Sequence, residues 1–169
     1  MDVTAILSDY FGGEKSEAAL ILAAGGLCLL AALWLAFVVR QPFARGLAVS
    51  LLLCAGLGLS VGGSVYFRTE SQLRALVELH QKDPGRFAAQ EGPRIRAVVQ
   101  SFGVYRLGYA VAVLLALVCV FAVGRPAWHG LAVGLLVLAA LGFTIDYYAE
   151  ARAVGYLRAL ESVGALPRG

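Results

Sequence analysis

Hydrophobic residues are concentrated in four long runs, near residues 18–39, 45–67, 105–124 and 127–149. Charged residues are nearly absent from these runs and frequent outside them. A helix of about 20 residues spans the hydrocarbon core of a bilayer, which is about 30 Å thick. Because lipid offers no hydrogen-bond partner to the backbone, an open strand is not a viable spanning element. The pattern therefore predicts four transmembrane helices.

The composition leads to the same conclusion and narrows the class of protein. The chain has 169 residues, of which 60% are hydrophobic and 15% charged, and its mean hydropathy is +0.77. A soluble domain of this length exposes too much surface to hide so many apolar side chains. The net charge of +3 comes from mixed acids and bases, which excludes the concentrated basic stripe of a nucleic-acid-binding protein. We expect a single all-α membrane domain over residues 1–169.

An internal repeat emerges when the chain is shifted so that Pro42 lies over Pro126, and we call this shift the repeat interval. The segment "PFARGLAVSLLLCAGLG" (42–58) then lies over "PAWHGLAVGLLVLAALG" (126–142), and "RTESQLRAL" (68–76) over "RAVGYLRAL" (152–160). Close to half of the positions from 42 to 76 are identical to their partners. The first run matches the third more weakly. Each copy is a two-span hairpin entering the membrane in the same direction, so the repeat predicts a pseudo-two-fold axis along the membrane normal.

Helices two to four are expected to extend beyond the membrane into a small helical cap on one side. Past the second run, an amphipathic stripe follows helical spacing at Leu73, Leu76, Val77 and His80. The "DPG" and "EGP" triplets indicate turns around a short helical piece, and Pro93 is expected to open the third helix.

These boundaries divide the single domain into parts. The first repeat covers about 17–80, the second about 101–164, and a connecting cap segment covers 81–100. The N-terminal segment lacks the basic start of a signal peptide, so the first apolar run is expected to be retained.

Membrane orientation depends on which charges are counted. The two short turns carry Arg40, Arg45 and Arg125 without an acid, whereas the cap side carries more Lys and Arg mixed with acids. Counting bases alone places the cap in the cytoplasm. The purely basic turns and the acidic N-terminal segment favour the reverse. We expect a bacterial inner-membrane protein whose termini and cap lie on the non-cytoplasmic side.

The sequence supports no catalytic residue, metal site or cofactor. Cys28, Cys54 and Cys119 lie inside apolar runs without metal-ligand spacing, and buried thiols of this kind usually act as small hydrophobes. His80 and His129 have no second histidine or cysteine at ligand spacing. Serines in "GGSVYFRTESQ" have no base beside them, so nucleophilic catalysis is unsupported.

One ionisable position interrupts a stripe of small residues that repeats every four positions. In the second run this stripe is formed by Gly46, Ser50, Cys54, Gly58 and Gly62, a spacing that lets another helix approach closely in lipid. In the second copy, an aspartate at position 146 stands where the first has its last glycine. An acid inside a spanning segment is a functional candidate by default.

We predict that Asp146 pairs with Arg106, because the first closes the fourth span and the second opens the third. Aromatic and charged neighbours complete a candidate site for a polar headgroup or an ion, although a structural ion pair at the interface explains the same residues. The candidate binding residues are Arg68, Glu70, Tyr105, Arg106, Tyr109, Asp146, Tyr147, Glu150 and Arg152.

Three functions remain open from the sequence. The first is a non-enzymatic membrane protein that binds another protein through its cap, as a subunit of a complex or an immunity-type inhibitor. The second is a small transporter or channel with a polar site around Asp146, in which a homo-oligomer is a natural assembly. The third is an interfacial lipid-modifying enzyme that uses Asp146 or Glu150 as an acid or base.

Overall fold

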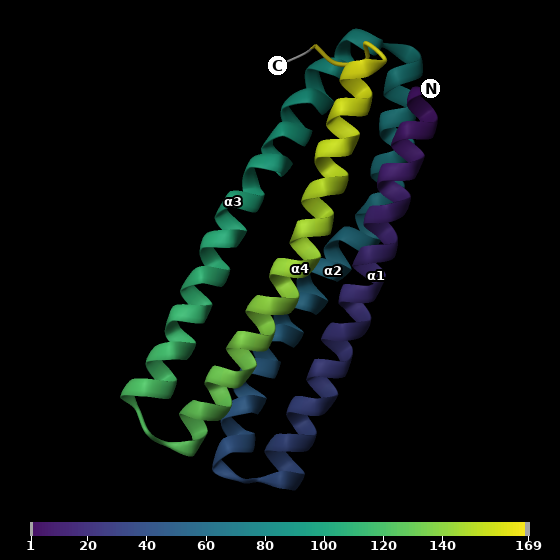
Figure 1. Cartoon of the computed structure of the whole chain (residues 1–169). Coiled ribbons are helices and arrows are strands. Elements are labelled where there is room, and N and C mark those ends of the chain that lie inside the picture. Colours follow the sequence, from purple (N-terminus) through teal and green to yellow (C-terminus); the bar gives the residue numbers. More distant parts are fainter. Residues whose placement is uncertain (1, 168–169) are drawn as a thin grey trace.

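The computed structural model describes residues 2–167 as a bundle of four long helices (Figure 1). These are α1 (Val3–Trp34), continued by the π-helical segment η1 (Leu35–Val39), α2 (Pro42–Lys82), α3 (Pro84–Ala122) and α4 (Pro126–Ser162). No strand occurs among the residues described. All four helices are long and apolar enough to cross a membrane, which agrees with the predicted number of candidate spanning helices and suggests a membrane protein.

Proline and aspartate fix where the helices begin. Pro42, Pro84 and Pro126 each occupy the first turn of a helix, where the missing N–H costs nothing and the fixed φ favours the helix. Asp83 caps α3 by accepting a hydrogen bond at Oδ1 from the backbone N–H of Arg86 at 2.9 Å. The side chain of Asp2 accepts from the backbone N–H of Thr4 at the start of α1.

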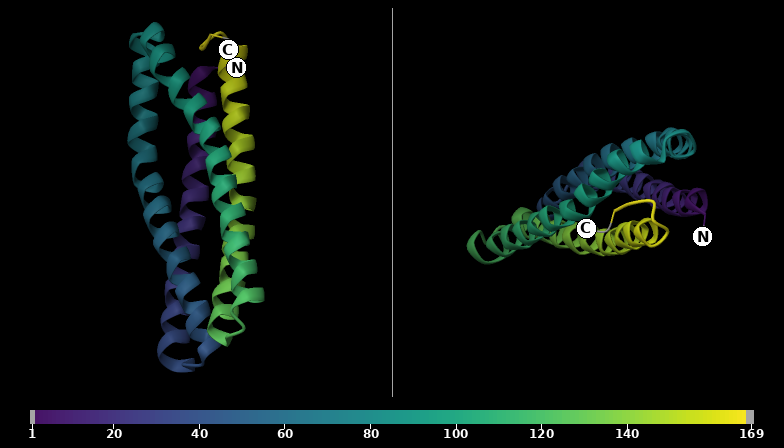
Figure 2. Two further views of the ribbon diagram at one scale, coloured as in Figure 1. Left: turned by 90° about the vertical axis from the view of Figure 1, so that its left-hand side faces the viewer. Right: turned by 90° about the horizontal axis from the view of Figure 1, so that it is seen from above.

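The two short turns lie together at the end of the bundle opposite both termini (Figures 1 and 2). In each turn one residue adopts positive φ, Arg40 at 55° and Gly124 at 52°. Glycine takes this conformation without steric cost, whereas an arginine is strained there. The two residues are separated by one repeat interval in the sequence.

α2 and α4 form the central pair of the bundle, with α1 packed along α2 and α3 along α4. The backbones of the central pair meet where glycines remove the side chains. A Cβ atom on Gly46 would lie 1.7 Å from the carbonyl oxygen of Ala127, and one on Gly130 would lie 2.0 Å from that of Phe43. The two contacts are reciprocal, since each residue of one contact has its counterpart one repeat interval away in the other.

Ser50 and Gly134 meet at the centre of this crossing. A Cβ on Gly134 would lie 2.3 Å from the Cβ of Ser50, and Ser50 Oγ donates a hydrogen bond to the carbonyl oxygen of Leu131 at 2.8 Å. Ser50 is fully buried. Positions 50 and 134 are also one repeat interval apart, so the contact joins two corresponding positions.

The end of the bundle that carries both termini holds the main hydrophobic core. The core is formed by all four helices and the C-terminal segment, and it includes Leu7 and Phe11 of α1, Phe87 and Ile95 of α3, and Leu160 of α4. α1 therefore also extends past its apolar run, which the expectation for helices two to four did not include. α1 begins at Val3 because its first turns present apolar residues at helical spacing to this core.

α3 is continuous through the segment expected to contain the second turn. It begins at Pro84 and runs through Gly92 and Pro93, so the prediction that Pro93 opens a new helix is wrong. Proline inside a helix removes one backbone hydrogen bond. Burial of Phe87, Glu91 and Ile95 on either side holds the segment helical despite this loss.

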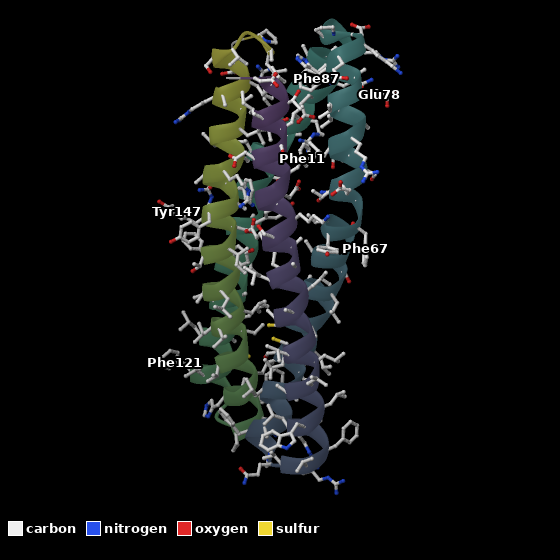
Figure 3. The ribbon with its side chains drawn as sticks, turned by 90° about the vertical axis from the view of Figure 1, so that its right-hand side faces the viewer. Phe11, Phe67, Glu78, Phe87, Phe121 and Tyr147 are labelled. Atoms are coloured by element: carbon white, nitrogen blue, oxygen red, sulfur yellow. The ribbon has the colours of Figure 1, made fainter. Side chains whose placement is uncertain are left out.

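Many large apolar side chains along the apolar runs point outward. Phe67 is 79% and Phe121 82% exposed, and both project away from the ribbon in Figure 3. Exposed apolar surface on this scale is unfavourable in water, whereas lipid solvates it. The exposed faces therefore fit a bundle surrounded by lipid.

Candidate functional site

The structure gives Asp146 a different partner from the one predicted. Tyr109 of α3 donates a hydrogen bond from its hydroxyl to Asp146 Oδ2 of α4 at 2.6 Å. Arg106 instead pairs with Glu150, with 3.0 Å between Nη2 and Oε1. The predicted Arg106–Asp146 ion pair is thus wrong. Arg106 and Asp146 lie at similar depth. Glu150 is one helical turn beyond Asp146 on α4, and it is this carboxylate that faces Arg106.

Arg106, Asp146 and Glu150 line a shallow hollow between α3 and α4, which we call the notch. Its lining residues are Phe102, Arg106, Phe143, Asp146, Tyr147 and Glu150. Tyr105 and Tyr147 are largely exposed, and Tyr147 points away from the bundle in Figure 3. The notch therefore joins two carboxylates, one guanidinium and several aromatic rings on a face open to the surroundings.

The remaining predicted site residues contact α1 instead of the notch. Arg152 donates to Glu17, Arg68 lies 3.9 Å from Glu14, and Glu70 pairs with Lys15 at 3.0 Å. The structure therefore divides the predicted site into the notch and a belt of ion pairs around α1. The acidic partners on α1 are not among the predicted site residues, because no helix is predicted before the first apolar run, whereas α1 begins at Val3. Apolar residues at positions 3, 6, 7, 10 and 11 are the signal that predicts a helix there.

Glu14 is incompletely paired within this belt. Its Oε2 atom is buried and accepts no hydrogen bond from the residues described. Burial raises the pKa of the Glu14 carboxyl, although Arg68, Arg94 and Arg152 oppose the shift. Glu14 lies just before the first apolar run, so the belt is at the level where the helices leave that run.

A second polar network, which sequence reasoning missed, lies inside the hydrophobic core. Glu91 is completely buried and accepts two hydrogen bonds from Arg94, both at 2.6 Å. Tyr156 of α4 donates its hydroxyl to Glu91 Oε1 at 2.7 Å. Tyr156 in turn stacks on Tyr10 of α1, with ring centroids 4.2 Å apart. Glu91 falls in the "EGP" triplet that suggested a turn, so no sequence signal pointed to its burial.

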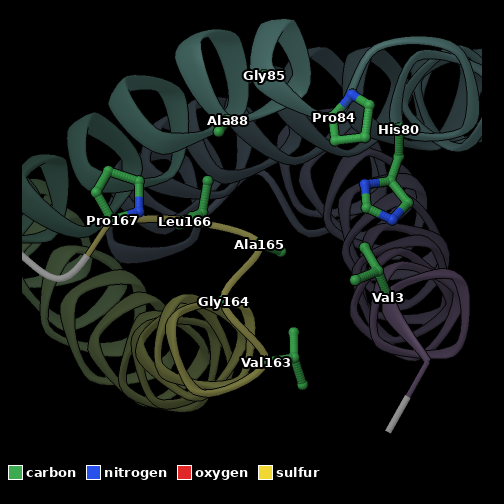
Figure 4. A pocket seen from close by; sticks show the side chains of 10 residues that line it. All are labelled: Val3, His80, Pro84, Gly85, Ala88, Val163, Gly164, Ala165, Leu166 and Pro167. Carbon is green, nitrogen blue, oxygen red and sulfur yellow. The ribbon is translucent and has the colours of Figure 1, made fainter.

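A second hollow, which we call the end groove, lies at the terminal end of the bundle (Figure 4). It has a volume of about 570 Å³. The start of α1, the α2–α3 junction and the C-terminal segment line it through Val3, His80, Pro84, Gly85, Ala88 and residues 163–167. His80 Nδ1 is buried and has no hydrogen-bond partner among the residues described. The groove is thus mostly apolar, beside one buried imidazole nitrogen that has no partner among the residues described.

The Tyr109–Asp146 hydrogen bond gives the first testable prediction. Tyr109→Phe is expected to lower the free energy of unfolding in detergent by about 1 kcal/mol, because a hydrogen bond between membrane helices is worth about that much. A double-mutant cycle of Tyr109→Phe with Asp146→Ala should show coupling, whereas one of Arg106→Ala with Asp146→Ala should show little. Stronger coupling in the second cycle would contradict this pairing.

The side chains of the notch, of the ion-pair belt and of the end groove can bind a ligand through charge and hydrogen bonds. Among residues 2–167, no group of three or more His, Cys, Asp and Glu side chains is arranged to hold a metal ion. Comparison with protein-family models, curated proteins and solved structures finds no match for this chain.

Proposed function

We propose that the chain is a non-enzymatic membrane protein that binds another protein through an extramembrane helical cap. The cap consists of the segments beyond the apolar runs, about residues 2–17, 68–104 and 150–167. In this proposal the protein acts as a subunit of a larger complex or as an inhibitor of immunity type. We propose that the protein is located in the bacterial inner membrane. The basic turns at Arg40 and Arg125 favour an orientation with the cap on the non-cytoplasmic side.

A tandem duplication accounts for the architecture of the proposed protein. The reciprocal approach of Gly46 and Gly130 and the contact of Ser50 with Gly134 are what a two-fold axis between two equal hairpins produces. Buried positions also correspond across the repeat interval well before residue 17. Further pairs buried in both halves are 3 and 87, 7 and 91, 11 and 95, 18 and 102, 32 and 116, 48 and 132, 55 and 139, 69 and 153, and 76 and 160. This supports a repeat that includes the cap helices.

The observation that carries the proposal is the end groove on a cap with its own packed core. The core residues Leu7, Phe87 and Leu160 and the buried Glu91 network make the cap a rigid surface. A rigid, mostly apolar groove with an unpaired polar atom suits an extended segment of a partner protein, because preorganised surfaces lose little entropy on binding.

Transport and lipid chemistry have less support from the geometry. Each carboxylate of the notch holds a protein partner, Asp146 a hydroxyl of Tyr109 and Glu150 the guanidinium of Arg106, so neither is a free acid or base for lipid chemistry. The notch is also much smaller than the end groove. A transport path needs a continuous polar route through the bundle, and the α2–α4 crossing is closed by direct backbone contact at Gly46 and Gly130.

Photo-crosslinking in the native membrane tests the proposal. A photoreactive phenylalanine analogue at Ala88, in the end groove, is expected to form a crosslink with one defined protein. The matched control is the same analogue at Phe121, which is exposed on the apolar part at the opposite end. It should give lipid adducts only.

Three outcomes distinguish the functions. A partner captured from Ala88 and lost in His80→Leu supports protein binding through the groove. A crosslink between two copies of this chain would mean that the groove binds a second copy, as in a homo-oligomer, and not a different protein. Absence of any protein adduct at Ala88 in the native membrane would overturn the proposal.

A further inference from the structure

The two hairpins differ at one level of the bundle, and the difference creates the notch. In the first hairpin α1 and α2 touch through glycines. A Cβ on Gly25 would lie 3.0 Å from the backbone nitrogen of Leu59, and one on Gly62 would lie 3.0 Å from that of Leu22. The helices therefore meet backbone to backbone, without room for a polar group between them.

In the second hairpin the corresponding positions carry large or charged side chains. Tyr109 is the repeat counterpart of Gly25, and Asp146 is the repeat counterpart of Gly62. The Tyr109 ring covers Gly142, where an added Cβ would lie 2.6 Å from the ring, and its hydroxyl bonds to Asp146. Tyr109 thus acts as a wedge between α3 and α4.

The other two charged residues of the notch are also specific to the second hairpin. Arg106 corresponds to Leu22, and Glu150 corresponds to Tyr66. At the corresponding level, where the helices of the first hairpin come to the end of their apolar runs, none of these four polar side chains is present. The charges of the notch are therefore not a general requirement for a helix that leaves the membrane.

The charge balance of the notch indicates what it lacks. Two carboxylates face one guanidinium, and Arg106 pairs with Glu150. Among residues 2–167, no Lys, Arg or His nitrogen lies within salt-bridge distance of Asp146, so its only hydrogen-bond partner there is a neutral hydroxyl. Arg106 is half exposed and bonds to Glu150 through one nitrogen, so it keeps donors for another anion.

We propose that the notch binds the headgroup of a phospholipid that carries both a phosphate and a primary ammonium, the phosphoethanolamine class. The ammonium group donates to Asp146 and supplies the missing positive charge. The phosphate accepts from the unused N–H groups of Arg106, as guanidinium and phosphate geometries match. Phe143 and Tyr147 are exposed beside the notch, so the acyl chains lie against aromatic and apolar surface.

The same geometry distinguishes this headgroup from those of other lipids. A choline headgroup has the positive charge but no N–H to donate, so it cannot make the hydrogen bond to Asp146. A glycerol headgroup offers a phosphate to Arg106 but only neutral hydroxyls to Asp146, so it supplies no positive charge there. The site is separate from the end groove, so this inference stands independently of protein binding through the cap.

Native mass spectrometry of the full chain tests the inference. The protein in detergent is mixed with phosphatidylethanolamine, phosphatidylcholine or phosphatidylglycerol of identical acyl chains. We expect the first to be retained about tenfold more than either of the others. Asp146→Asn should remove this preference, because it keeps the size of the side chain and removes its charge. Glu78→Gln, which neutralises an exposed carboxylate paired with Lys82, should preserve it.

Two further arms guard against misinterpretation. Circular dichroism of Asp146→Asn should show unchanged helical content, so that a lost preference is not caused by unfolding. Soluble glycerophosphoethanolamine should compete only weakly, because it lacks acyl chains. Equal retention of the three lipids, a preference that survives Asp146→Asn, or equally tight binding of the soluble headgroup would overturn the proposal.

Discussion

Replacement of Gly46 by alanine is expected to force α2 and α4 apart and to lower the free energy of unfolding by about 3 kcal/mol or more. The added Cβ would lie 1.7 Å from the carbonyl oxygen of Ala127, a backbone atom that cannot rotate away. Separation of the helices also removes the hydrogen bond from Ser50 to Leu131. Gly130→Ala should have the same effect, since Gly130 makes the reciprocal contact with Phe43.

The control for this prediction is another glycine of the same helix. A Cβ on Gly56 would meet nothing within 4 Å, so Gly56→Ala should be neutral or stabilise by up to about 1 kcal/mol, because alanine favours the helix. Unfolding is followed by circular dichroism in mixed micelles of increasing denaturing-detergent content. A Gly46→Ala variant as stable as Gly56→Ala would mean that the backbones do not meet at this crossing.

The second large effect is expected for Glu91→Leu, which should cost about 3–5 kcal/mol. The substitution removes the acceptor of both hydrogen bonds from Arg94 and of the one from Tyr156. Arg94 would then be a partly buried cation without a partner. Removing one member of a buried ion pair is costly because the charge that remains has lost both water and its counter-ion.

A compensating variant separates this charge effect from simple packing damage. Arg94→Met combined with Glu91→Leu should recover much of the loss, because an apolar pair of similar size fits the same core. Glu78→Gln, at an exposed ion pair with Lys82, should change stability little. If the double variant is less stable than Glu91→Leu alone, the loss arises from packing and not from the unpaired arginine.

The two predictions concern contacts that join helices at opposite ends of the bundle. The glycine crossing joins the two hairpins at the turn end, where the packed residues are small. The Glu91 network joins α3 to α4 at the terminal end, inside the core to which α1 also contributes. The proposed function depends mainly on the second, because the end groove is built on that core. Glu91→Leu is therefore also expected to weaken partner crosslinking from Ala88.

The small-residue stripe of α2 shows how far a pattern alone can lead. Its spacing predicted close approach of a neighbouring helix, and the structure has such contacts near both ends of the stripe. Gly46 and Ser50 face α4, whereas Gly58 and Gly62 face α1. A four-residue spacing drifts around a helix with 3.6 residues per turn, so the stripe turns from one neighbour to another. The spacing predicts contact but not the identity of the partner.

The number of helices, but not where all of them start, could be predicted from the sequence, since the first and third begin earlier than expected, at Val3 and Pro84. Long apolar runs must be helical in lipid because the backbone has no other hydrogen-bond partner, and proline at positions 42, 84 and 126 sets three of the starts. These features depend on neighbours along the chain, so a one-dimensional pattern is sufficient to predict them.

The pairing of charged groups, in contrast, follows from the packing of the whole bundle. Asp146 and Arg106 lie at similar depth, yet with the observed orientation of α4, Arg106 pairs with Glu150 and Asp146 accepts a hydrogen bond from Tyr109. Helical extension of α1 and burial of Glu91 likewise depend on a core to which all four helices contribute. Polar partners are fixed by the rotation and relative height of the helices, and no spacing along a single helix contains that information.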